Sequence, residues 1–133
     1  MKIEKLIENG YTYFISGLAL GMEMICAEII IKLNNKYPDI ILEGAIPCKD
    51  QDKKWCTKDK FRYAKIKNQC DILNTLYDNY TDNCMLKRND YIISKSSFIL
   101  AISNGNTLGG TAYTIRHAIQ NNVNIEIINP YDY

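Results

Sequence analysis

Two kinds of segment alternate along this 133-residue chain, and their alternation restricts the fold more than any other feature. Stretches such as FILAI (98–102) are apolar at consecutive positions, which is typical of strands that are covered on both faces. This order predicts an α/β protein with a doubly wound, mostly parallel sheet of about five strands. We expect strands at 11–16, 40–46, 72–77, 98–103 and 124–129, and helices at 21–36, 58–69, 82–95 and 110–121.

Composition adds few constraints. No repeat, low-complexity tract or linker interrupts the pattern, so we expect one domain over residues 1–133. The formal net charge of +1 gives no global attraction to nucleic acid or to an anionic membrane. No apolar run approaches the ~20 residues that span a bilayer, and the N-terminal MKIEKLIENG fits a short amphipathic helix ended by Gly10 rather than a signal peptide. We therefore expect no membrane partner and a cytoplasmic location.

The cysteines argue against a metal site. They are odd in number and form no C-x-x-C pair, and His117 is the only histidine. A tetrahedral zinc site needs closely paired ligands, which this spacing does not offer. We expect reduced thiols, no metal and no cofactor. The cysteines are Cys26, Cys48, Cys56, Cys70 and Cys84.

Three loops carry glycine or proline where a predicted strand ends. Each could be an ordinary turn, because glycine readily adopts positive φ. In parallel α/β folds, however, ligands collect outside the carboxyl ends of the strands, so three such loops on one rim predict a binding site. The candidate residues are Ser16, Gly17, Leu18 and Gly21 in the first loop, Pro47 in the second, and Ser103, Gly109, Gly110 and Thr111 in the third.

The third loop has the chemistry of a phosphate site. Gly109, Gly110 and Thr111 open a predicted helix, where backbone N–H groups lack partners and the helix dipole is positive. Thr111 could donate its hydroxyl to a phosphate or simply cap the helix. Arg88, on the preceding predicted helix, could bind a phosphate through two hydrogen bonds, the alternative being a solvated helix face.

The first loop suits a sugar better than a phosphate. Glu23 lies in the first turn of the helix that follows Gly21. It could simply complement the helix dipole, or it could accept hydrogen bonds from ribose hydroxyls. A carboxylate at that position would repel a phosphate, so the sugar is the better ligand for it.

Residues 49–67 combine eight Lys or Arg with only three Asp, and they include Trp55, Phe61 and Tyr63. Basic residues interleaved with aromatics are typical of single-stranded nucleic-acid binding. The alternative is a solvated helix whose aromatic side chains point into the core.

Four stretches of the chain resemble one known group: FISGLALGMEMICAEI, YPDIILEGAIPCKDQDKKW, YTDNCMLKRNDYII and GGTAYTIRHA. They are similar to the SLOG superfamily, in particular to its short bacterial and phage members related to YpsA. The more specific features are Gln51 with Trp55, the Cys84-to-Asn89 motif and the Gly-Gly-Thr turn. The resemblance implies a Rossmann-like three-layer α/β/α fold and binding of nucleotides or nucleotide-derived signals. Relatives include the Lonely-Guy phosphoribohydrolases and the DNA-binding DprA proteins.

The chain departs from this pattern at its start. Typical members begin with a strand and a Thr-Gly-His-Arg-Pro-like loop, whereas this sequence starts at about the following helix. A central strand is then missing, so the other strands must close up or borrow one from another chain. Exposed strand edges favour such pairing, so we expect a homo-oligomer, a dimer in the first instance.

The second departure concerns catalysis. The Lonely-Guy motif Pro-Gly-Gly-x-Gly-Thr-x-x-Glu, aligned on its Gly-Thr pair, puts Thr114 where the catalytic glutamate stands, while Arg88 matches the family's upstream arginine. Threonine cannot supply acid–base catalysis near neutral pH, a contribution typically worth about 10²–10⁴ in rate. Any activity would have to use Glu23 with Arg88.

The sequence therefore favours a non-catalytic module that holds a nucleotide or nucleotide-derived signalling ligand, as a sensor or as a protein that sequesters the signal. A nucleotide N-glycosidase that uses Glu23 is the alternative. DprA-like binding of single-stranded DNA through residues 49–67 is a second alternative, and nucleic acid is the less expected partner.

Overall fold

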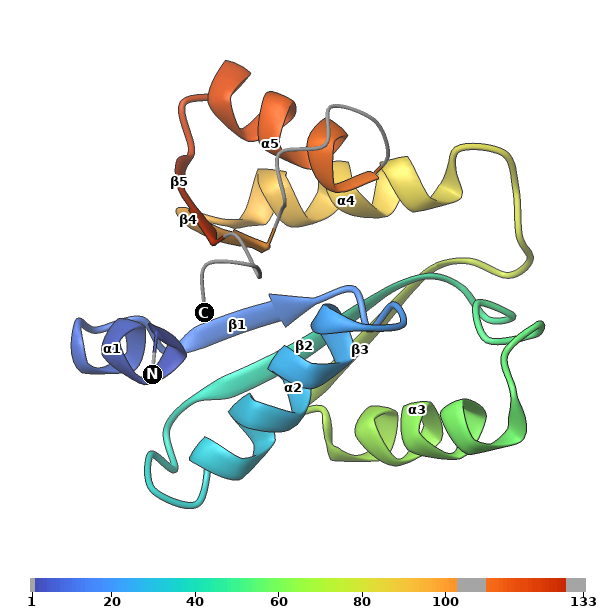
Figure 1. Cartoon of the computed structure of the whole chain (residues 1–133), viewed down its shortest axis with the longest axis horizontal. Helices are drawn as coiled ribbons and strands as arrows, with labels where there is room; N and C mark the ends of the chain where they lie inside the picture. Colours follow the sequence, from blue (N-terminus) through green and yellow to red (C-terminus); the bar gives the residue numbers. More distant parts are fainter. Residues whose placement is uncertain (1, 103–109, 129–133) are drawn as a thin grey trace. The chain divides into compact units, whose positions relative to one another are not determined.

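The computed structural model describes residues 2–102 and 110–128, and these form two compact units, Met1–Tyr80 and Thr81–Tyr133 (Figure 1). Helices and strands alternate along both units, and every strand pairing is parallel. The predicted α/β class with parallel strands is therefore confirmed. No helix in the described part of the chain is both long and apolar enough to cross a bilayer.

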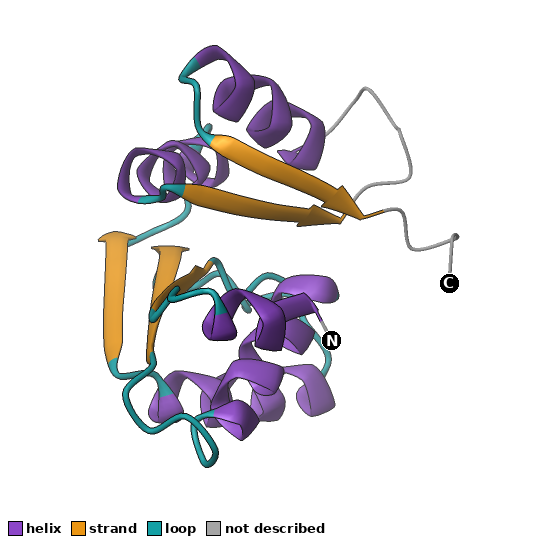
Figure 2. Ribbon diagram, turned by 90° about the vertical axis from the view of Figure 1, so that its left-hand side faces the viewer, coloured by secondary structure: helices purple, strands orange, loops and turns teal. Residues whose placement is uncertain are grey.

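The first unit is a three-stranded sheet in the order β1-β2-β3. Its helices gather on one side of that sheet (Figure 2). The register pairs Tyr13 with Ile41 and Glu43 with Ile72. The elements are α1 (Lys2–Glu8), β1 (Tyr13–Ser16), α2 (Met22–Leu33), β2 (Ile41–Cys48), α3 (Thr57–Gln69) and β3 (Ile72–Tyr77).

The core of the first unit forms around β2, whose residues 42–48 are all buried. Helices α2 and α3 each bury a stripe against the rest of the unit, and apolar residues at helical spacing explain why these segments form amphipathic helices. The stripes are Met24, Ala27 and Ile30 in α2, and Tyr63 and Ile66 in α3.

The middle strand contains a proline, and the sheet register explains how it is accommodated. β1 ends at Ser16, which pairs with Gly44, so beyond Gly44 strand β2 pairs only with β3. Pro47 lies between Ile46 and Cys48, which face Thr75 and Tyr77 of β3. On the β1 side no described strand requires an N–H from residue 47, so the missing donor costs no sheet hydrogen bond.

The second unit contains α4 (Cys84–Lys95), β4 (Phe98–Ile102), α5 (Gly110–Gln120) and β5 (Asn124–Ile128). β4 and β5 pair in parallel, with Phe98 opposite Asn124, and α4 lies beside α5 (Figure 1). A small apolar cluster holds these elements together: Ile93, Ile99, Ala101 and Ala118, with Ile115, Val123 and Ile125 packed against it.

All the predicted strands and helices are present in the expected order, but their limits differ in detail. The second helix ends at Leu33 rather than at 36, and β2 continues to Cys48 rather than ending at 46. Within the first unit three strands pair, and within the second unit two strands pair. Within its own unit, β1 has β2 as its one described neighbour, and β4 has β5.

Candidate ligand site at the strand ends

The loop between β1 and α2 is held by a chain of hydrogen bonds. The Leu18 backbone N–H donates to Ser16 Oγ at 3.2 Å, and this hydroxyl donates to the Glu23 carbonyl oxygen at 3.1 Å. Ser16 is 8% exposed. Three of the predicted site residues are therefore brought together at the carboxyl end of β1.

Leu18 has an unusual backbone conformation for its residue type, with φ at 55° and a side chain that is 0% exposed. A left-handed conformation costs a non-glycine residue roughly 1–2 kcal/mol. Burial of the leucine side chain offsets that cost, since it contributes about 1.5–3 kcal/mol. Strained residues of this kind cluster at ligand sites. Gly21, which ends the loop, has φ 94°, a conformation that favours glycine.

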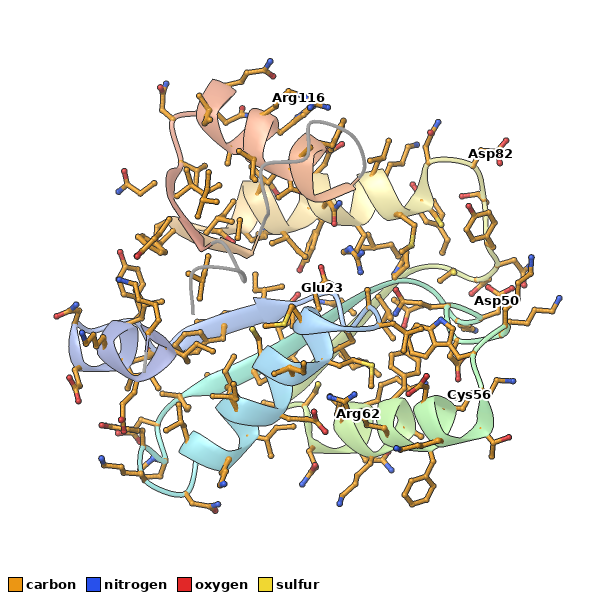
Figure 3. All side chains as sticks on the ribbon, viewed as in Figure 1. Glu23, Asp50, Cys56, Arg62, Asp82 and Arg116 are labelled. Carbon is orange, nitrogen blue, oxygen red and sulfur yellow. The ribbon has the colours of Figure 1, made fainter. Side chains whose placement is uncertain are left out.

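Glu23 fixes the loop from the first turn of α2 (Figure 3). Its Oε2 atom accepts a hydrogen bond from the Ala19 backbone N–H at 2.9 Å. The carboxylate thus closes the loop onto the start of the helix and places negative charge there. This arrangement suits hydroxyl or amine donors on a ligand and disfavours a phosphate at the start of α2.

The second loop follows β2 and is tied to the first. Pro47 is buried near the end of β2, and Gln51 lies four residues further on. Gln51 Nε2 donates to the Gly17 carbonyl oxygen at 3.4 Å and to the Tyr63 hydroxyl at 3.0 Å. The Trp55 ring packs edge-on to Tyr63, with ring centroids 4.9 Å apart. Gln51 and Trp55, quoted above for the family resemblance, therefore connect the loop after β2 to the loop after β1 and to α3.

Two buried acceptor atoms in this loop have no hydrogen-bond partner: Asp50 Oδ1 and Gln51 Oε1. Asp50 is labelled in the loop after β2 in Figure 3. Neither residue is among those predicted from the sequence as ligand contacts, although their position directly after a strand end was an available signal. Buried oxygens are nearly always paired in native proteins, so these two atoms are candidates for binding something that donates hydrogen bonds.

The third strand of the unit contributes an ion pair at the same edge. Lys49 Nζ lies 3.2 Å from Asp78 Oδ1, which joins the segments after β2 and β3, and both side chains are exposed. A pair this exposed is worth less than about 1 kcal/mol, so it contributes charge to the rim rather than rigidity.

Arg88 belongs to the second unit, where it is 3% exposed in α4. The alternative of a solvated helix face is therefore wrong. Its Nε donates to Asn89 Oδ1 at 2.9 Å. A buried guanidinium is costly to keep unless it is paired, and it is well suited to binding an anion through several N–H groups.

The third predicted loop is described only in part. Ser103 and Gly109 lie outside the described residues. Gly110 is the first residue of α5, as expected for a loop that opens a helix, and Thr111 follows it. Thr114, which the resemblance aligns with the catalytic glutamate of the Lonely-Guy enzymes, is half-buried in α5.

All five cysteines are thiols rather than disulfides, and two of them are held in the unreactive protonated form. Burial raises the pKa of the Cys26 thiol and raises that of Cys70 to about 11, so both stay protonated near neutral pH. Within residues 2–102 and 110–128, no three His, Cys, Asp or Glu side chains lie together in a way that could hold a metal.

The aromatic residues of the basic segment 49–67 differ in their exposure. Tyr63 is fully buried, and Trp55 packs against it, as the alternative of inward-pointing side chains expects. Phe61 is 74% exposed on α3, and Lys58 and Lys65 are exposed three residues before it and four after it. These three side chains share one helix face. Arg62, on the adjacent position, instead binds Glu28 of α2.

Comparisons with known proteins agree with this architecture. The family profile described as the YspA SLOG family (YpsA) matches residues 1–133. The chain is 28% identical over 137 residues to a UPF0398 protein of Halalkalibacterium halodurans, an alignment of 98% of this chain and 72% of the relative. It is 32% identical over 121 residues to the uncharacterized SPbeta prophage-derived protein YoqJ of Bacillus subtilis, an alignment of 80% of this chain and 70% of that protein.

A UPF0398 protein of Bacillus pumilus is 28% identical over 88% of this chain, and the alignment covers 64% of that relative. The chain thus spans about two thirds of the length of the curated relatives that it matches. Because the profile match extends over the whole sequence, the chain belongs to the YpsA SLOG family.

Proposed function

We propose that this protein binds a nucleotide or a nucleotide-derived signalling ligand without converting it, as a sensor or as a protein that sequesters the signal. One observation carries the proposal: the loop after β1, with Leu18 held at φ 55°, is joined by Gln51 to the loop after β2. Two linked loops at the carboxyl ends of parallel strands form the usual location of a ligand in such folds.

Within each unit, the candidate residues suit one kind of chemical group. The Glu23 carboxylate and the loop that it closes suit the sugar hydroxyls. In the second unit, the buried Arg88 and the start of α5 at Gly110 are the groups that suit a phosphate. Thr114 offers no proton chemistry near neutral pH, which favours holding the ligand over cleaving it.

The experiment is isothermal titration with AMP, ADP, ADP-ribose and cyclic nucleotides. We expect at least one to bind, and we expect Arg88→Lys, which keeps the charge but loses the paired N–H groups, to weaken binding about tenfold or more. Arg116→Lys on α5 is the matched control, because Arg116 is exposed. Absence of binding by every nucleotide, or equal binding by both variants, would contradict the proposal. Release of free base from a nucleoside monophosphate would instead support the N-glycosidase alternative.

We also propose a second candidate function, binding of single-stranded DNA, because Phe61 stands exposed between Lys58 and Lys65 on one face of α3. Phe61 could stack on a base while the two lysines contact phosphates. Anisotropy of a labelled oligothymidine should then rise with protein and fall steeply with salt, and Phe61→Ala should weaken binding. The exposed Tyr80→Ala serves as the control, and anisotropy that does not change with protein concentration would dismiss this candidate.

We further propose that the protein is a homo-oligomer, in the first instance a dimer. Nine of the twelve residues of α2 (MEMICAEIIIKL) are apolar, and Met22 and Ile25 are 42% and 38% exposed, while Met24, Ala27 and Ile30 are buried within the unit. Exposed apolar side chains gathered on one helix face are a feature of association surfaces.

A further inference from the structure

The first unit has the order of a mononucleotide-binding βαβ motif. Strand β1 leads through the Gly17–Gly21 loop into α2, and β2 returns parallel to β1. In dinucleotide-binding domains of this topology, an acidic side chain near the end of the second strand accepts hydrogen bonds from the ribose. Asp50 occupies the equivalent place here, two residues after Cys48 ends β2.

A site that binds ribose hydroxyls needs oxygen atoms that can accept hydrogen bonds and that are not already paired with a donor. Asp50 and Gln51 each supply one such atom. Asp50 Oδ1 and Gln51 Oε1 are both buried and have no hydrogen-bond partner. The nearest lysine in sequence, Lys49, is directed to Asp78. The backbone of the turn is satisfied separately, since the Gln51 N–H donates to the Cys48 carbonyl oxygen and the Lys53 N–H donates to that of Asp50.

The orientation of the Gln51 amide is determined by its surroundings. Its Nε2 donates to the Gly17 carbonyl oxygen, which can only accept. A flipped amide would place two oxygens against each other there, so Oε1 must be the unpaired atom. The same bond holds Gln51 beside the loop after β1, where the sugar of a bound nucleotide is expected. Both residues are partly exposed as whole side chains, so they lie close to the surface of the loop.

We propose that Asp50 Oδ1 and Gln51 Oε1 accept hydrogen bonds from the 2′- and 3′-hydroxyls of a ribose. This inference rests on the proposed nucleotide-binding function and names the part of the ligand that the loop after β2 recognises. Two acceptors on consecutive residues match the number of donors in a vicinal diol. A metal ion fits less well, because the described residues bring no third His, Cys, Asp or Glu to this loop. The preference is for ribonucleotides over their deoxy counterparts.

The test compares AMP and ADP with their 2′-deoxy and 2′,3′-dideoxy analogues by isothermal titration of the full chain. We expect the dideoxy analogues to bind at least about tenfold more weakly than the ribonucleotides, as loss of a hydrogen bond to a charged group implies. Asp50→Asn should weaken ribonucleotide binding by a similar factor and leave dideoxynucleotide binding unchanged. Asp52→Asn, a change of the same kind two residues along the loop, should alter neither.

Each outcome decides the inference. Equal affinity for ribo- and dideoxynucleotides would overturn it while leaving the proposed function intact, and it would indicate that an enclosed water pairs the two oxygens. An Asp50→Asn variant that loses both kinds of ligand equally would also overturn it. Binding of no nucleotide at all would remove both proposals. Circular dichroism of Asp50→Asn serves as the folding control, and an intact spectrum is expected because the change removes a buried charge without changing the side-chain shape.

Discussion

At the scale of single residues, the candidate site depends on side chains whose roles are set by long-range contacts. Leu18 tolerates its left-handed backbone because its side chain is completely buried. Gln51 bonds to Gly17, 34 positions earlier in the chain, and to Tyr63. A sequence pattern reports neither a positive φ at a leucine nor the partner of a distant amide. The glycines and Glu23 could be predicted because helix and strand ends have local signals, whereas Gln51 could not be assigned a role in this way.

Glu23 gives the first prediction. Glu23→Ala removes the acceptor of the Ala19 N–H, so we expect the free energy of unfolding to fall by about 1 kcal/mol and ligand binding to weaken. Glu23→Gln keeps an oxygen in the same place and should retain most of the stability. Urea unfolding of the two variants measures the difference, with the exposed Glu8→Ala on α1 as the control. Equal unfolding midpoints for the Ala and Gln variants would show that the carboxylate does not hold the loop.

At the scale of the elements, the sequence predicted which segments form helices and strands better than it predicted where they end. FILAI forms β4 as expected, since an apolar run of this kind suits a strand covered on both faces. Pro47 was the natural place to end β2, because proline is a poor residue for a central strand. Pro47 remains within β2 because β1 has already ended opposite Gly44. Where β1 ends relative to β2 depends on the strand register, which the local sequence does not reveal. The predicted helix at 82–95 begins at Cys84 after Asn83, whose φ of 70° is not readable from the sequence.

The contact between α2 and α3 carries the second prediction. Arg62 Nε donates to the two Glu28 carboxylate oxygens at 3.1 and 3.0 Å, and these hydrogen bonds lower the pKa of Glu28 below its ordinary value of 4.5. Because the folded-state pKa is the lower one, the pair stabilises the fold above about pH 4.5, and this stability is lost as the pH falls through the folded-state value. Glu28 is 43% exposed, so screening limits the contribution to less than about 1 kcal/mol.

The measurement is urea unfolding of the wild type and of Arg62→Ala at neutral pH and at successively lower pH. We expect the variant to be less stable at neutral pH, and the difference to shrink as Glu28 is protonated. Lys58→Ala, on the same helix, removes a positive charge that is exposed and should show no such convergence. A stability difference that is constant with pH would mean that Arg62 acts through packing of its side-chain stem rather than through its charge.

At the scale of the whole molecule, the fold class could be predicted because alternation of apolar strands and helices is a property of the entire sequence. The strand order within each unit could not be predicted, because pairing depends on which edges meet in space. Within the described strands of each unit, the edge strands have one neighbour each. Strands with an open edge and a helix with an exposed apolar face both favour association with further polypeptide.

The third prediction concerns that association. If two copies pack through the outer face of α2 in antiparallel orientation, the exposed Met22 and Ile25 of one helix meet the same face of the other, and such a contact is self-complementary, as a two-fold dimer requires. Ile25 lies on that face, so Ile25→Glu should place a charge in the interface and convert a dimer to a monomer. Phe61→Glu on α3 is the matched control, because Phe61 is more exposed and lies on a different helix.

Sedimentation velocity over a range of protein concentrations separates the cases: the wild type and Phe61→Glu should sediment as dimers and Ile25→Glu as a monomer. A wild type that remains monomeric at every concentration would refute the oligomer, and an Ile25→Glu variant that still dimerises would place the interface away from α2, with the open edge of β1 as the next surface to test.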